Sequence, residues 1–226
     1  PIFTASLKDE PVSLNKHKSG KVRIFSGAPL DFSLVVRKSL LGCIRLIQRN
    51  KLSFESAPGL IAQSREWHDL HEWLSEYGSN RIVCGDYKAF DKTMPPSIIF
   101  ASFKILFEIC IRSGNYSADE CMIIRGISTD IAYALTNYNG DLFMFFGSNP
   151  SGNPLTVIIN CLANCLYMRY VYHVLNPKCT GATDFRSNVR LITYGDDNTL
   201  SSKVDWFNHT TISNCLKNEL GIIYTM

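Results

Sequence analysis

The tetrapeptide Tyr194-Gly195-Asp196-Asp197 decides the fold of this chain, together with the runs Val189–Thr193 and Asn198–Leu200 on either side of it. β-prone residues on both sides of a Gly-Asp-Asp turn predict a tight hairpin. The tip of this hairpin holds two adjacent carboxylates, which repel each other unless a cation lies near them. Mg²⁺ commonly takes one or two protein carboxylates together with phosphate and water oxygens. We therefore expect the tip to meet a metal–phosphate complex. A solvated loop is the alternative for these four residues read alone.

A second acidic group follows the short apolar run Ile82–Cys84, which predicts a strand. Asp86 stands at the end of this strand, and Asp91 follows five positions later. Two-metal catalysis needs acidic groups from separate elements, so that the two ions lie about 3.5–4 Å apart. We expect Asp86 and Asp196 to lie side by side and share divalent ions, whereas Asp91 points elsewhere and has a different role. Read alone, Asp86 is equally explained as a strand-end or capping residue.

Between the two acidic groups lies the loop Gly147–Pro154, in which six of eight residues are Gly, Asn or Pro. An apolar helical run, Leu155–Leu175, follows at once. Thr156 and Asn160 are four positions apart and are expected to share one face of that helix. Polar groups on such a face, next to a loop with a Ser-Gly pair, can hydrogen-bond sugar hydroxyls. An ordinary loop and first helical turn is the alternative.

The order of these motifs resembles the palm of viral RNA-dependent RNA polymerases, most closely the picornavirus-like group. Asp86-x4-Asp91 resembles motif A, Ser151-Gly152-x3-Thr156-x3-Asn160 resembles motif B, and Tyr194–Asp197 resembles motif C. The likeness covers roughly residues 8–224. It implies an α+β fold: a right-hand polymerase palm, built from a small antiparallel sheet with packed helices, plus part of the fingers and without the thumb.

Basic residues gather near the amino end of the chain. The first fifty residues carry nine Lys or Arg against three acids, whereas the whole chain has a net charge of only +3. The total is too small to indicate nucleic-acid binding, but the segregation of charge favours a site for phosphates. The alternation over residues 21–24 predicts a strand with one cationic face, and a solvated hairpin is the alternative.

This basic segment also resembles motif F of the same family, the fingers loop above the nucleotide channel. The matching basic positions are Lys8, Lys16, Lys21 and Arg23. Val12 departs from the pattern, because a basic residue is usual at its place in the nearest relatives. One triphosphate or template contact is therefore missing from the match.

The resemblance implies template-directed transfer of nucleotides from NTPs to an RNA 3′-hydroxyl, with two Mg²⁺ ions, or Mn²⁺ in their place. The implied metal ligands are Asp86, the backbone carbonyl of Tyr87, Asp196 and, as a weaker contributor, Asp197. The implied triphosphate contacts are Lys8, Lys16, Lys21 and Arg23. The implied contacts to the ribose and its 2′-hydroxyl are Asp91, Ser151, Gly152, Thr156 and Asn160. A buried polar site of this kind rejects a substrate that lacks the hydroxyl, because its own groups are then left unpaired.

The resemblance also divides the chain. Residues 1–80 are expected to form part of the fingers and residues 81–226 the palm, with the catalytic core at about 79–209. The motif D lysine, the primer-grip hairpin and the thumb are expected to be missing, so the chain alone is predicted to be inactive. The implied partners are an RNA template-primer, NTPs and other viral replication proteins. The implied location is the host cytoplasm, in replication complexes associated with host membranes.

Composition argues against several other classes. Eight cysteines without a CxxC pair indicate a reduced compartment and core packing rather than a disulfide or zinc framework. The amino end has no basic start followed by an apolar run, so no signal peptide is predicted. The run Leu155–Leu175 contains Asn160, Asn164, Arg169 and His173, which are costly in hydrocarbon. It is therefore predicted to be a buried core helix and not a transmembrane segment.

Two rival functions remain at this stage. A reverse transcriptase also carries a strand-tip Asp-Asp, but the position of Asp91 is normally aromatic there, and a comparison of NTP with dNTP incorporation separates the two. A non-catalytic RNA-binding or structural module would not need both Asp86 and Asp196, and its melting would not respond to metal with NTP. A viral coat domain would show many short, evenly spaced strands, which the long helical runs contradict.

Other local signals complete the expected pattern of helices and hairpins. Pro95-Pro96 predicts the start of a helix over Pro96–Ile111, and Ser117–Glu120 has the spacing of a capping box. Asn139-Gly140 predicts a second hairpin. Near the carboxyl end, apolar residues four apart predict a helix that Gly221 ends.

Overall fold

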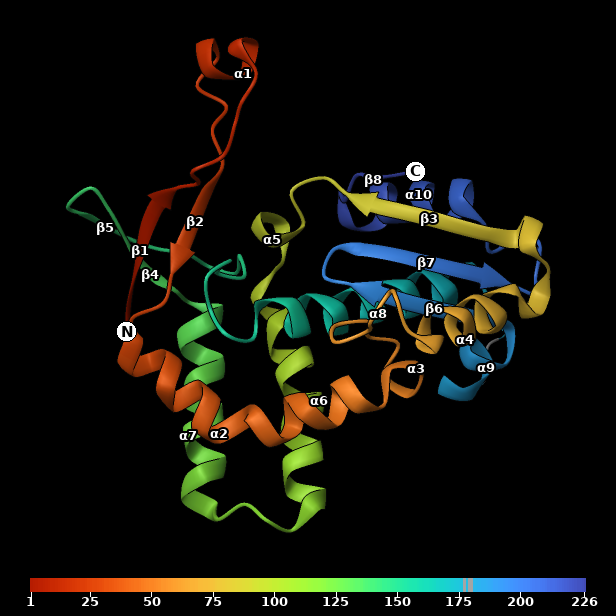
Figure 1. The fold of residues 1–226 in the computed structure, drawn as a ribbon, viewed down its shortest axis with the longest axis horizontal. Helices are drawn as coiled ribbons and strands as arrows, with labels where there is room; N and C mark the ends of the chain where they lie inside the picture. Colours follow the sequence, from red (N-terminus) through yellow and green to blue (C-terminus); the bar gives the residue numbers. More distant parts are fainter. Residues whose placement is uncertain (177, 179–180) are drawn as a thin grey trace. The chain divides into compact units, whose positions relative to one another are not determined.

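The computed structural model describes residues 1–176, 178 and 181–226 (Figure 1). The chain forms two units, each made of segments that are distant in sequence. Unit 1 comprises Pro1–Leu41 and Met94–Thr156, and unit 2 comprises Gly42–Thr93 and Val157–Met226. This division does not follow the expected boundary after residue 80, because each unit closes by packing an early segment against a later one. The division into fingers and palm stays a prediction.

Unit 1 contains a four-stranded sheet with the strand order β2-β1-β4-β5. Within it β1 pairs antiparallel with β2 and parallel with β4, and β4 pairs antiparallel with β5. The elements are β1 (Ile2–Leu7), α1 (Leu14–Lys18), β2 (Ile24–Gly27), α2 (Leu30–Arg49, which continues into unit 2), α6 (Pro96–Ser113), α7 (Ala118–Ala132), β4 (Leu135–Tyr138) and β5 (Asp141–Met144).

Two predicted helix starts and one predicted hairpin in unit 1 are confirmed. The helix α6 begins at Pro96 and is ended by Gly114 in the left-handed conformation, and α7 opens with the reciprocal capping box of Ser117 and Glu120. Figure 1 shows α6 and α7 as an antiparallel pair. The hairpin of β4 and β5 turns at Asn139-Gly140, where both residues have positive φ, as a type I′ turn requires.

One expectation for unit 1 is wrong, because no strand runs over residues 21–24. The strand β2 begins only at Ile24. Gly20 has a φ of 65°, and the Lys21 amide donates to the Lys16 carbonyl at 2.9 Å, which is the Schellman pattern that caps the end of α1. Only the bond from the Lys8 amide to the Arg23 carbonyl, 2.9 Å, extends the pairing of β1 and β2 past Ile24. The cationic segment is therefore a short helix and a turn.

Unit 2 contains a second four-stranded sheet with the strand order β6-β7-β3-β8, in which neighbouring strands are antiparallel. The elements are α3 (Lys51–Phe54), α4 (Arg65–Leu74), the 3₁₀ turns η1 (Ser75–Tyr77) and η2 (Ser79–Arg81), β3 (Ile82–Tyr87), α5 (Phe90–Thr93), α8 (Thr156–Leu175), α9 (Ala182–Asn188), β6 (Val189–Tyr194), β7 (Asp197–Ser202), α10 (His209–Leu220) and β8 (Tyr224–Thr225).

The helix α8 supplies much of the core, as its sequence predicted. Most of its side chains are buried, including the polar Asn160 and Asn164. The helix α10 ends, as predicted, at Gly221, which has a φ of 66°. In the part of the chain that the structure describes, no helix combines the length and the apolar character needed to cross a lipid bilayer.

Gly85 in β3 is required by space and not by backbone conformation. A Cβ atom at this position would lie 1.8 Å from the hydroxyl oxygen of Tyr224. Gly126 is the opposite case, because it is exposed within α7 and a Cβ atom there meets nothing within 4 Å.

Replacing Gly85 with Ala should destabilise the protein by about 1–3 kcal/mol, because an added methyl group overpacks the site. The matched change Gly126→Ala should stabilise it by about 0.5–1 kcal/mol, since alanine favours a helix interior. Chemical denaturation measures both free energies of unfolding. Equal effects of the two variants would contradict this account of Gly85.

Candidate active site

The predicted hairpin forms at the predicted residues. The strands β6 and β7 pair down to Tyr194 and Asp197, so that Gly195 and Asp196 make a two-residue turn. Gly195 has a φ of +66°, and Asp196 is not among the residues with positive φ. A positive φ at the first central residue alone is the pattern of a type II′ turn, which suits the twist of antiparallel strands. Gly195 is needed here because glycine adopts a positive φ without steric cost.

The strand β3 brings Asp86 to this turn. Gly85 pairs with Asn198 of β7, and the same antiparallel register places the next residue, Asp86, opposite Asp197. Figure 1 shows the end of β3 and the turn between β6 and β7 at one edge of the sheet. On its other side Asp86 pairs with Thr225 of β8. Two acidic motifs that are far apart in sequence therefore meet across neighbouring strands.

The three carboxylates influence one another electrostatically. Burial raises the pKa of Asp197, and the nearby negative charges of Asp196 and Asp86 raise this pKa further. Asp86 and Asp197 are exposed, and Asp196 is half-buried. Like charges gathered in this way are stabilised by a divalent cation, and carboxylate oxygens are ligands that Mg²⁺ prefers. The carboxylates of Asp86, Asp196 and Asp197 are therefore suitable ligands for the expected Mg²⁺ ions.

The acids do not by themselves form a complete set of protein ligands around an ion. Across residues 1–176, 178 and 181–226, no group of three or more His, Cys, Asp or Glu side chains is arranged to hold an ion. Mg²⁺ usually keeps several waters and binds through one or two carboxylates plus substrate phosphates. The side chain of Tyr87 points into the core, where its hydroxyl donates to Asn164 Oδ1 at 3.2 Å. The role proposed for its backbone carbonyl stays a prediction.

Asp91 and Asn160 meet within unit 2. Asn160 Nδ2, on α8, donates to Asp91 Oδ1 at 2.5 Å. Burial raises the pKa of Asp91, the hydrogen bond from Asn160 lowers it, and the charge of Asp196 raises it. Asp91 is therefore held by an amide of α8 within the electric field of Asp196. Among the residues that the structure describes, the Asp91 carboxylate has a hydrogen-bond donor and that of Asp86 has none. The separate role expected for Asp91 stays a prediction.

The Ser-Gly loop is built into unit 1. The Ser26 amide donates to Ser151 Oγ at 3.3 Å, and the Gly152 amide donates to the Ser26 carbonyl at 2.9 Å. A Cβ atom at Gly152 would lie 2.5 Å from the Ser26 oxygen, so only glycine allows this approach. Thr156 Oγ1 donates to the Pro150 carbonyl at 2.8 Å. Ser151 and Thr156 thus shape the loop, and their contact with a ribose stays a prediction.

The basic residues of the amino end are also in unit 1. Lys8, Lys16, Lys21 and Arg23 are all exposed. Arg23 Nη1 forms an exposed ion pair with Glu10 Oε2 at 3.4 Å, and such pairs contribute little to stability. These side chains are therefore accessible to an anionic ligand.

Asn164 is a central residue whose role in the site the sequence analysis missed. It is fully buried, and its Nδ2 donates to the carbonyls of Gly195, Asp196 and Asp197 at 3.2, 2.9 and 3.3 Å. Its Oδ1 accepts from the Tyr87 hydroxyl and from Asn198 Nδ2 at 3.2 and 3.1 Å. One amide therefore joins the turn to β3. The available signal was a second Asn in an apolar helix, four positions after Asn160.

The cysteines of α8 serve the same turn. Cys161 Sγ accepts the Gly195 amide at 3.1 Å. Burial raises the pKa of Cys161, so the thiol stays protonated. The described cysteines are all free thiols. The predicted core packing of Cys161 is confirmed, and the sulfur atom adds a second link between α8 and the turn.

Comparison with known proteins places this geometry in context. The sequence model of the family described as "Viral RNA-dependent RNA polymerase" matches residues 1–225. The "Replicase polyprotein" of Cricket paralysis virus is 34% identical over 96% of this chain and 13% of its own length. The "RNA1 polyprotein" of Raspberry ringspot virus is 30% identical over 99% of this chain and 10% of its own length.

The fold has a counterpart among solved structures. A chain described as "Sicinivirus 3Dpol RNA dependent RNA polymerase" superposes with a TM-score of 0.81 at 20% identity, over 99% of this chain and 45% of that one. The expected α+β polymerase fold is therefore confirmed. This chain spans less than half of that structure and about an eighth of the Cricket paralysis virus polyprotein.

Replacing Asn164 with Leu should destabilise the protein by at least about 2 kcal/mol, because several buried polar groups lose their partner at once. Hydrogen exchange at residues 193–198 should accelerate in the same variant, since the turn loses its anchor. Asn218→Leu, at an exposed position of α10, is the control and should change neither measurement appreciably. Unchanged exchange at the turn in Asn164→Leu would show that this amide does not hold it.

Proposed function

Because this chain belongs to the viral RNA-dependent RNA polymerase family, we propose that it carries the catalytic and nucleotide-binding core of an enzyme that copies viral RNA from NTPs. The observation that carries the proposal is the meeting of Asp86 with the turn that bears Asp196 and Asp197. These acids come from two strands and leave exposed carboxylate oxygens at one edge of the sheet. A binding module has no need for such a cluster of like charges.

Asp86 and Asp196 would hold two Mg²⁺ ions, with Asp197 and the carbonyl of Tyr87 as further contributors. When bound, such ions lower the pKa of the primer 3′-hydroxyl and neutralise the leaving pyrophosphate. The chain's own contribution is to gather the carboxylates at one edge of the sheet. Asn164 contributes by neutralising the carbonyl dipoles beneath the turn, so that the acids above it are presented in one arrangement.

The nucleotide would be bound by two further groups of side chains. Exposed cations of unit 1, namely Lys8, Lys16, Lys21 and Arg23, would bind the triphosphate. In unit 2, the hydrogen-bonded pair of Asp91 and Asn160 would read the ribose 2′-hydroxyl. In unit 1, Ser151, Gly152 and Thr156 of the loop would contact the ribose. A carboxylate held by an amide at this place, where a reverse transcriptase carries an aromatic gate, favours ribonucleotides.

The surroundings of the enzyme follow from the family. We propose an RNA template-primer and other viral replication proteins as partners, and membrane-associated replication complexes in the host cytoplasm as the location. Synthesis would require the complete polymerase, because this chain covers less than half of the solved polymerase that it resembles.

Replacing Asp196 with Ala in the full-length polymerase should lower nucleotide incorporation by at least about a thousandfold, because metal ions supply several kcal/mol of transition-state stabilisation. Primer extension with Mg²⁺ measures the rate. Asp69→Ala is the matched control, since Asp69 is an exposed acid on α4 that pairs only with Arg65 at 3.6 Å. Substantial synthesis by Asp196→Ala would remove the two-metal proposal.

Replacing Asn160 with Ala should lower the preference for NTP over dNTP by about tenfold or more, because the 2′-hydroxyl then loses part of its hydrogen-bonding site. The measurement is the ratio of kcat/KM for GTP and dGTP on one template. Asn218→Ala should leave the ratio unchanged. A preference equal to that of the wild type in Asn160→Ala would assign discrimination to other residues.

A further inference from the structure

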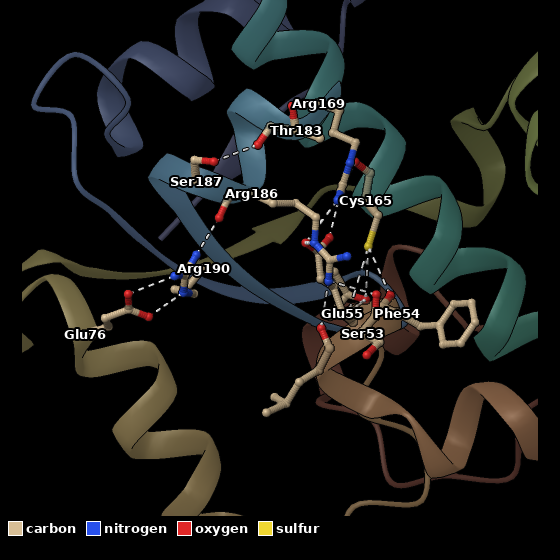
Figure 2. A network of polar contacts seen from close by, with 12 residues as sticks. Ser53, Phe54, Glu55, Glu76, Cys165, Arg169, Thr183, Arg186, Ser187 and Arg190 are labelled. Carbon is tan, nitrogen blue, oxygen red and sulfur yellow. Dashed lines mark hydrogen bonds and ion pairs between the residues drawn. The ribbon is translucent and has the colours of Figure 1, made fainter. Parts of the chain in front are cut away.

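Glu55 is a buried acid that the proposed mechanism does not use. Only 2% of its surface is exposed, and its φ of 54° is unusual for a residue other than glycine. Its carboxylate receives both guanidinium nitrogens of Arg169, from α8, at 2.7 and 3.0 Å. Arg186, from α9, adds a third contact at 3.5 Å. Figure 2 shows these side chains converging on Glu55.

The backbone of Glu55 is bonded to a different element. Its carbonyl accepts from the Thr193 amide at 2.9 Å and from Thr193 Oγ1 at 2.7 Å. The Thr193 carbonyl in turn accepts from the Ala57 amide at 2.8 Å, so residues 55–57 run beside the end of β6. Thr193 is buried and stands two residues before the turn that begins with Gly195. Glu55 therefore holds α8 with its side chain and the base of the acidic turn with its backbone.

The same helix reaches the turn directly. Arg169 lies on α8 five positions after Asn164, whose amide binds the carbonyls of the turn. The turn is thus tied to α8 at its tip, through Asn164 and Cys161 Sγ. At its base Thr193 contacts Cys161 and also reaches α8 through Glu55 and Arg169. Two separate attachments to one rigid helix restrict the rotation of a hairpin tip, whereas one attachment leaves it free to pivot.

A stability role alone would not require this arrangement. Replacing a buried ion pair with apolar residues of similar volume is often neutral or stabilising, so charge at such a place is weak support for stability. A bidentate Arg–carboxylate pair instead adds geometric specificity. Groups behind metal ligands orient those ligands, and their loss typically weakens metal binding by about 10–100-fold.

We propose that Glu55 and Arg169 are positioning residues that set the orientation of Asp196 for divalent-metal binding through Thr193. This inference rests on the proposed function, because it takes Asp196 to be a metal ligand. It adds to the site a pair of residues that touches neither metal nor substrate.

The test is direct Mn²⁺ binding to the full-length polymerase, followed by the EPR signal of the free ion, together with the melting temperature of each variant. Arg169→Lys keeps the charge but loses the two-pronged bond. It should weaken Mn²⁺ binding about five- to tenfold at temperatures where the protein is fully folded. In primer extension, the Mg²⁺ concentration for half-maximal rate should rise by a similar factor, while KM for NTP at saturating Mg²⁺ stays near its wild-type value.

The matched control is a second Arg–Glu pair, whose arginine lies on β6, the strand that carries Thr193. Arg190, at the start of β6, binds Glu76 through two nitrogens at 2.6 and 2.8 Å. Its Nη1 also donates to the Arg186 carbonyl, and Figure 2 draws no bond from Arg190 to Glu55. Arg190→Lys should leave Mn²⁺ binding within twofold of wild type. Equal weakening by both Lys variants would overturn the inference, because any lost ion pair would then have the same effect.

Thr193→Val keeps the residue's shape and removes the hydroxyl, which donates to the Glu55 carbonyl at 2.7 Å and also lies 3.5 Å from the Cys161 carbonyl and 3.9 Å from Cys165 Sγ. It decides the question if Arg169→Lys fails to fold, and should weaken Mn²⁺ binding in the same direction. Wild-type Mn²⁺ binding by folded Arg169→Lys, or by Thr193→Val in its place, would overturn the inference even if melting temperatures fall. Asp196→Ala separates the two proposals: if it binds Mn²⁺ as the wild type does, the proposed function fails first and this inference with it.

Discussion

The repulsion among the acids at one sheet edge is the constraint around which unit 2 is organised. The antiparallel register of β3 and β7 sets Asp86 opposite Asp197, and the charges of Asp86 and Asp196 both raise the pKa of Asp197. Such an arrangement costs free energy in the absence of a cation. It persists because the strands that carry the acids are held by interactions that do not depend on the acids themselves.

Those interactions are polar and buried. Asn164 satisfies three carbonyls of the turn and two donors from neighbouring strands, and Tyr224 donates its hydroxyl to Asn198 Oδ1 at 2.8 Å. Burial raises the pKa of Tyr224, which keeps this hydroxyl a donor. In a region of low dielectric, fully satisfied networks of this kind rigidify a structure, and partly satisfied ones destabilise it. The turn is therefore positioned by hydrogen bonds, which fix the direction of their partners. Apolar packing alone does not fix direction in this way.

In unit 1, the main structural feature of the candidate site is the loop Gly147–Pro154, which is held in one conformation. The Gly152 backbone approaches Ser26 so closely that a Cβ atom would clash, and buried amides from Asn149 and Asn153 bond within the loop, with Asn153 Nδ2 reaching Asn149 Oδ1 at 3.1 Å. The loop is thus ordered by its own residues, by β2, and by bonds from the Gly147 and Ser148 amides to the carbonyls of Ala132 and Met94. Its serine and threonine hydroxyls are shaped before any ligand arrives, which lowers the entropic cost of binding.

Local signals were enough to predict the hairpin at Tyr194–Asp197, the capping box at Ser117 and the stop at Gly221, because turn and capping preferences act over a few residues. The meeting of the two acidic motifs was predicted instead from the need of two-metal chemistry for acids from separate elements. The same local reasoning wrongly extended a strand over residues 21–24, where the bond from the Lys21 amide to the Lys16 carbonyl caps α1 and β2 begins only at Ile24. The roles of Asn164 and Glu55 were decided only by the tertiary structure. An Asn in an apolar helix and a lone Glu before Ser56 carry no local mark of their partners, since those partners lie about 30 to more than 110 positions away and meet them only once the core excludes water.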